Sequence, residues 1–95
     1  MSLFCARVVL NGDAPYEVYE GVHNAMGYFG FHRQFFDGNG QRRVTPDATY
    51  VGESGLADFA LLDILKNAVS AHWLNNGVLL MRLQSAVFEG LPCAA

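Results

Sequence analysis

Alternating and continuous hydrophobic runs predict a strand near each end of the chain. Residues 3–10 (LFCARVVL) form a short apolar run that stops at Asn11-Gly12, a pair typical of a strand entering a turn. Residues 78–83 (VLLMRL) repeat the pattern close to the C-terminus. Successive side chains of a strand point to opposite faces of a sheet, and both sets are mostly apolar here. We therefore expect a sheet with two largely apolar faces.

Two segments have apolar residues at the three- and four-residue steps of an amphipathic helix. The first follows Asp13-Ala14-Pro15, which offers a capping side chain and a proline for the first turn, and it runs to Phe29 with Gly30 as a left-handed cap. The second opens at Ser54 or Gly55, each of which can begin a helix, and ends before Asn75. The predicted apolar positions are Tyr19, Val22, Met26 and Phe29 in the first helix, and Phe59, Leu62, Leu65, Val69 and Trp73 in the second.

Residues 31–52 predict a β-hairpin. Gly38-Asn39-Gly40 suits the positive φ angles of a tight turn between two arms. Pro46 cannot donate a hydrogen bond to a neighbouring strand, so we expect a kink in the return arm before residues 48–51 resume the strand. Residues 85–91 add a short apolar segment, for which one helical turn is expected.

The order of elements is β-α-β-β-α-β within a single domain spanning residues 1–95. One compact solution for this order is the α+β ferredoxin-like sandwich, an antiparallel four-stranded sheet with both helices on one face. This arrangement leaves the other sheet face uncovered. Because that face is apolar, we expect a homodimer that packs sheet against sheet or shares a strand edge.

Composition and charge narrow the classes of function. The chain is 52% hydrophobic and 16% charged, which excludes intrinsic disorder, and its formal net charge of −3 gives no overall attraction to nucleic acid or anionic membrane. We expect a cytoplasmic protein with no membrane association and no DNA partner, because neither a signal peptide nor a membrane-spanning run is found. Its two cysteines, Cys5 and Cys93, lack metal-site spacing and are expected to be reduced thiols.

The residues that could carry chemistry gather in the first helix and the hairpin. The histidines have no zinc-ligand spacing, and we expect neither a metal nor a cofactor. Three of the six basic residues lie on the two arms of the hairpin, interleaved with aromatic residues that could stack on bases while guanidinium groups hold phosphate. The alternative is an ordinary solvated face of paired arginines. The candidate RNA-binding residues are Arg33, Arg42, Arg43, Phe35 and Tyr50.

The motifs RVVLNG, YEGVHNAM, GYFGFHRQF, DGNGQRR and TPDATYVGES, in this order, resemble the family of small bacterial proteins grouped with the GhoS antitoxin. The resemblance spans residues 7 to about 91. It implies a ferredoxin-like fold similar to that of small CRISPR-associated nucleases, and a toxin–antitoxin role with cleavage of a toxin messenger RNA. Where such nucleases carry an acidic residue at the end of the first strand, this chain has Asn11, with Asp13 two residues later.

Asp13 is thus one candidate catalytic residue. A metal-free route is the alternative, with His32 or His23 as acid or base and the arginines stabilising the phosphate. Three functions stay open from the sequence: a protein that binds or cleaves single-stranded RNA, a non-catalytic dimeric module that uses its apolar sheet face, and a binder of a small ligand between the helices and the hairpin.

Overall fold

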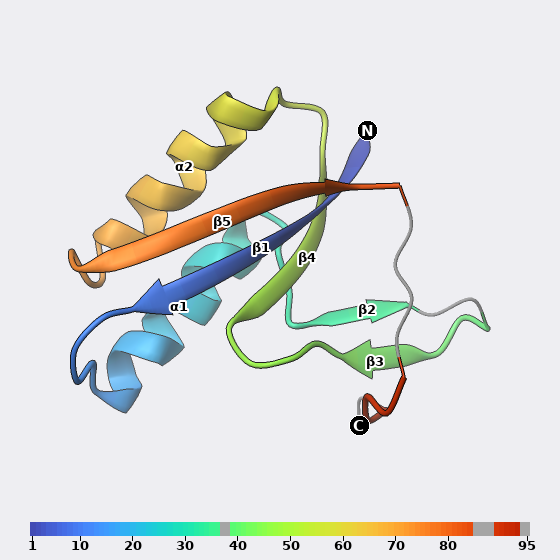
Figure 1. Ribbon diagram of the computed structural model, residues 1–95, viewed down its shortest axis with the longest axis horizontal. Helices are drawn as coiled ribbons and strands as arrows, with labels where there is room; N and C mark the ends of the chain where they lie inside the picture. Colours follow the sequence, from blue (N-terminus) through green and yellow to red (C-terminus); the bar gives the residue numbers. More distant parts are fainter. Residues whose placement is uncertain (37–38, 85–88, 94–95) are drawn as a thin grey trace.

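The computed structural model describes residues 1–36, 39–84 and 89–93. They form an α+β fold with a three-stranded antiparallel sheet, a separate two-stranded ribbon and two helices (Figure 1). The elements, in chain order, are β1 (Ser2–Leu10), α1 (Tyr16–Tyr28), β2 (Gln34–Phe36), β3 (Arg42–Val44), β4 (Thr49–Ser54), α2 (Asp58–Ser70) and β5 (Asn76–Leu83).

Strand β1 lies at the centre of the main sheet, whose order is β4-β1-β5. It runs antiparallel to both neighbours, and Cys5 pairs with Val51 on one side and with Met81 on the other. The alternation predicted for residues 3–10 is confirmed, because every second residue is buried, from Phe4 to Leu10. Side chains alternate between the two faces of a strand, and the buried set is the one that packs against the helices.

Both helices cover the same face of this sheet, as expected (Figure 1). Helix α1 contributes Val22 and Met26 to the core, and α2 contributes Leu61, Leu65 and Val69. These side chains pack against the buried residues of β1. Burying each such side chain stabilises the fold by roughly 1.5–3 kcal/mol.

The buried stripe of α2 differs from the predicted one. Phe59 was expected in the core, but 83% of it is exposed. Two residues turn a helix by about 200°, so a helix that buries Leu61 must direct Phe59 towards the opposite side. Apolar residues lie around most of the circumference of α2, so their spacing alone could not show which of them face the core.

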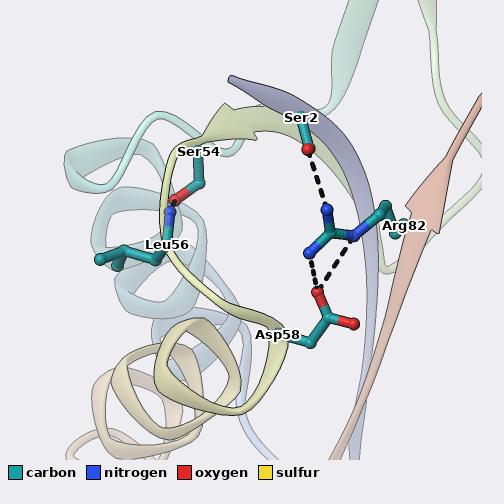
Figure 2. Close-up of polar contacts among 5 residues, drawn as sticks. All are labelled: Ser2, Ser54, Leu56, Asp58 and Arg82. Atoms are coloured by element: carbon teal, nitrogen blue, oxygen red, sulfur yellow. Dashed lines mark hydrogen bonds and ion pairs between the residues drawn. The ribbon is translucent and has the colours of Figure 1, made fainter.

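The helix starts also correct the sequence analysis. The N-caps are Pro15 for α1 and Ala57 for α2, and neither has a side-chain capping bond. Asp13 therefore does not cap α1. Ser54 lies three residues before the N-cap of α2, where its hydroxyl accepts a hydrogen bond of 3.1 Å from the backbone N–H of Leu56 (Figure 2).

The described residues form a main sheet of three strands and not the expected four. After α1, Gly30 adopts a positive φ of 83°, which turns the chain towards β4. His32 then meets Val51 in an isolated antiparallel bridge: each backbone N–H donates to the other residue's carbonyl, at 3.0 and 2.8 Å. Beyond this bridge the chain leaves the sheet and pairs β2 with β3.

The kink predicted at Pro46 is confirmed and explains the departure. The return arm divides into β3 and β4, and between them Ala48 has a left-handed φ of 58°. The buried Thr45 hydroxyl donates to one of two carbonyls in reach, that of Arg33 at 2.9 Å and that of Thr49 at 2.7 Å. These contacts hold the kink, so the β2–β3 ribbon projects from one end of the sheet (Figure 1).

Arg82 fastens the end of β5 to two other elements. Its guanidinium donates to the Asp58 carboxylate at the start of α2 and, at 3.1 Å, to the Ser2 hydroxyl on β1 (Figure 2). The same group lies 5.2 Å from the centre of the Phe4 ring. Arg82 therefore closes the core at this end, although the ion pair itself is exposed.

Two sequence predictions fall partly outside the described residues. Gly38 of the predicted hairpin turn and residues 85–88 of the apolar segment are not described. The residues that follow, 89–93, lie partly along the ribbon, where the N–H of Val44 donates to the carbonyl of Pro92 at 3.0 Å.

Candidate functional site

An open pocket of about 520 Å³ lies where α1, the segment after it, the β2–β3 ribbon and β4 meet. Six of the side chains predicted from the sequence as site residues line it, although they come from four separate parts of the chain. The lining residues are His23, Asn24, Phe31, His32, Arg33, Gln34, Phe35, Phe36, Arg42 and Tyr50.

A histidine–tyrosine pair forms the inner wall of this pocket. The Nδ1 atom of His23, on α1, lies 2.5 Å from the hydroxyl of Tyr50, on β4. Only 2% of Tyr50 is exposed, so its ring belongs to the core and only its hydroxyl is available to the site. Tyr50 consequently positions His23, and its ring does not offer a stacking surface to a ligand.

The surroundings keep both members of this pair uncharged. Burial raises the pKa of Tyr50 to about 12, with the positive charge of Arg33 as a weaker opposing effect. Burial lowers the pKa of His23, Arg33 lowers it further, and Glu20 opposes both. At neutral pH the site therefore holds a neutral imidazole, the form that can accept a proton.

Local sequence places the two histidines. Val22 faces the core, and its neighbour His23 is turned about 100° around α1, towards β4. Gly27, one turn further along α1, lies against the ring of His32, whose nearest atoms are 3.6 Å from the position that a Cβ at residue 27 would occupy. The absence of a side chain at Gly27 leaves room for His32 beside the helix.

Two arginines and one exposed ring complete the open side. The Arg42 guanidinium donates to the Gln34 side chain at 3.3 Å, and Arg42 pairs with Phe36 across the ribbon. Phe36 is 71% exposed, whereas the predicted Phe35 is half-buried. Arg33 acts electrostatically on both His23 and Tyr50, which places its charge at the inner wall.

Arg43 and Asp13 do not belong to this pocket. The Arg43 guanidinium is directed to the C-terminal segment, where it lies 2.9 Å from the Cys93 sulfur and 3.5 Å from the carbonyl of Leu91. Asp13 lies exposed in the loop between β1 and α1. Neither is among the residues that line the site.

Four further lining residues were not among the predicted site residues: Asn24, Phe31, Gln34 and Phe36. A signal for two of them was present in the ribbon. Alternate residues of a strand share a face, so Gln34 and Phe36 accompany Arg42 once the β2–β3 register is known. Asn24 gave no comparable signal.

The described residues, 1–36, 39–84 and 89–93, contain no candidate for a metal site or a membrane-spanning helix. No group of three or more His, Cys, Asp or Glu side chains in this part of the chain could hold a metal ion. Within the same ranges, neither helix is long and apolar enough to cross a membrane.

Comparison with known proteins adds no relative: no protein-family model and no curated protein matches this sequence. The feature that bears on function is the pocket, in which histidines, arginines and aromatic rings meet.

Proposed function

We propose that this protein binds single-stranded RNA in the pocket between α1 and the β2–β3 ribbon. The observation that carries the proposal is the convergence of Arg33, Arg42, His23 and His32 with the exposed ring of Phe36 around one open cavity. Guanidinium groups bind phosphate, and an exposed aromatic ring stacks on a base of any sequence. The pocket volume is within the range of small-molecule sites, so it can take a nucleotide unit.

Local charge supports this function in spite of the acidic chain. The net charge is −3, so no long-range field attracts RNA to the whole surface. Two of the six basic residues line a single pocket, and phosphate contacts at that place suffice for salt-dependent binding. Binding of this kind is local, and it should be weak at high salt.

The proposal extends to the type of domain. We take the chain as a ferredoxin-like domain whose fourth strand is reduced to the bridge between His32 and Val51. The strand order β4-β1-β5 and the helices on one face support this view. It agrees with the resemblance to the GhoS antitoxin family and with a role as an antitoxin or regulator that acts on RNA.

The same pocket supports cleavage of the bound RNA without a metal. Neutral His23 accepts the proton of a ribose 2′-hydroxyl while the 2′-oxygen attacks phosphorus, and the bond from phosphorus to the 5′-oxygen breaks. His32 donates a proton to the departing 5′-oxygen. Arg33 and Arg42 stabilise the charge on the phosphorane, and the products are a 2′,3′-cyclic phosphate and a 5′-hydroxyl.

Binding is tested by titrating labelled single-stranded RNA of mixed sequence at low and moderate salt. We expect the affinity to fall as salt rises. Arg33→Ala and Arg42→Ala should each make the negative slope of log K against log salt shallower by about 0.7. Arg82→Ala is the matched control, because it removes an exposed arginine outside the pocket. Equal loss in all three variants, or no binding by the wild type at low salt, would contradict the proposal.

Cleavage is tested on the same RNA with Mg²⁺ or EDTA. We expect equal cleavage in both, 2′,3′-cyclic phosphate ends, and loss of cleavage but retention of binding in His23→Gln. Cleavage that stops in EDTA contradicts the metal-free route. Binding without any cleavage restricts the function to RNA binding.

A further inference from the structure

The face of the main sheet opposite the helices is apolar and has no helix over it. The register of β4, β1 and β5 arranges the side chains of this face in three rows. The first row holds Glu53, Leu3 and Leu83. The second holds Val51, Cys5 and Met81, and the third holds Thr49, Arg7 and Leu79. Leu79 and Val9 are 57% and 54% exposed on this face. An apolar surface of this extent on a small domain is characteristic of an interface.

This face carries two exposed side chains of opposite charge. Arg7 lies on the central strand, and Glu53 lies on β4, opposite Leu3. Four residues of β1 separate the two levels, which is about 13 Å along the strand. Within the described residues, no ion pair involves either of them. Cys5 lies at the level halfway between the two charges.

We propose that this face packs against the same face of a second copy, with the two β1 strands antiparallel and a two-fold axis passing through the level of Cys5. The axis lies in the interface and perpendicular to the strands. This axis sets Arg7 at the same level as the partner's Glu53. The two residues then lie on strands about 5 Å apart in the lateral direction, a distance that an arginine side chain spans. By symmetry, the same contact forms a second time at the other end.

Charge disfavours a face-to-face arrangement with the two-fold axis parallel to β1. A two-fold axis parallel to β1 keeps every row at its own level, so Arg7 meets the partner's Arg7 and Glu53 has no basic neighbour. The perpendicular axis also sets Leu79 against the partner's Leu83 and Met81 against the partner's Met81. An interface that pairs apolar residues and neutralises both charges is self-complementary, as a two-fold contact requires.

The first experiment measures mass by light scattering after size exclusion, from micromolar to 100 micromolar protein. We expect a dimer that Leu79→Asp weakens at least about 100-fold, because each new carboxylate would be buried against the partner's Leu83 and would draw Arg7, its neighbour in the same row, away from the partner's Glu53. Leu74→Asp is the control, because Leu74 is 85% exposed and does not lie on this face. Both leucines are exposed in the monomer, so circular dichroism should show both variants folded. A wild-type monomer at 100 micromolar, or equal loss in both variants, overturns the proposal.

The second experiment tests the orientation by charge exchange. Arg7→Glu alone sets carboxylates against each other at both ends of the interface, and Glu53→Arg alone sets guanidinium groups against each other. Each single variant should weaken the dimer, and the double variant should restore it. A double variant that is no better than the worse single one contradicts the pairing of Arg7 with the partner's Glu53.

The third experiment tests the position of the axis. In a Cys93→Ser background, Cys5 is the only thiol, and a short bifunctional maleimide should link two copies through it. Cys5→Ser with Cys93 retained is the control and should give no link. A dimer that does not cross-link through Cys5 excludes an axis at this level.

Discussion

Removing one hydroxyl group tests the account of the pocket most directly. Tyr50→Phe deletes the partner of His23 and leaves the buried ring in place. A hydrogen bond of this kind contributes about 1 kcal/mol net, so the variant should unfold about 4–8 °C below the wild type at pH 7. The pocket should also lose the fixed orientation of the His23 ring.

The pH dependence gives the larger effect. The pKa of Tyr50 rises from 10 in the unfolded chain to about 12 in the folded protein. The folded state thus favours the protonated hydroxyl. This stabilisation is fully present below pH 10 and is lost as the pH rises from 10 to 12. One pKa unit corresponds to 1.36 kcal/mol, so the loss reaches about 3 kcal/mol across this window.

Urea unfolding at several pH values between 7 and 12, followed by circular dichroism, measures this effect. The difference in unfolding free energy between wild type and Tyr50→Phe isolates Tyr50, because the other titrating groups cancel. Below pH 10 the wild type should be the more stable by about 1 kcal/mol. As the pH approaches 12, Tyr50→Phe should become the more stable of the two proteins. A constant difference over the whole range would refute the assignment of Tyr50 as a buried, neutral hydroxyl.

Three further predictions concern neighbouring positions. Gly52→Ala should destabilise the fold by about 1–3 kcal/mol in chemical unfolding, because the added Cβ would lie 2.5 Å from the carbonyl oxygen of Gly30. The control Gly55→Ala should cost little, because its Cβ would meet only the Met1 side chain, at 4.0 Å. Ala48→Gly should raise stability by up to about 1 kcal/mol, since it relieves a left-handed φ of 58°; an unchanged or lower melting temperature would contradict this. The pKa of His23 is lowered from 6.5, so the folded state disfavours its charged form, and the wild type should lose stability relative to His23→Gln as the pH falls below 6.5. Parallel stability curves for these two proteins between pH 7 and 5 would be the contrary result.

Local patterns predicted most elements of this chain. The β1 strand and the two helices correspond to runs whose period is set by neighbouring residues, and Gly30 and Pro46 act on the backbone at their own positions. The exact helix starts were not predictable in the same way. A capping side chain such as Asp13 can form a cap, but the chain after β1 must also reach the sheet face, and α1 begins at Tyr16 without that cap.

The composition of the pocket was only partly predictable. The sequence indicated that histidines, arginines and aromatic residues cluster along residues 23–50, and six of those residues meet. Arg42 and Arg43 are adjacent in sequence and therefore point to opposite faces of the ribbon. No local pattern shows which face turns to the pocket, so the separation of Arg43 from the site required the three-dimensional arrangement.

The sequence alone predicted β1, both helices, β5 and the apolar character of both sheet faces, because these depend on the spacing of residues a few positions apart. The tertiary structure decided how they meet. It left the main sheet with three strands and only one bridge to the segment after α1, between His32 and Val51, because the kink at residues 45–48 carries the ribbon away from the sheet. It also brought His23 to Tyr50 across 27 residues, since the two share a wall only when α1 packs on β4.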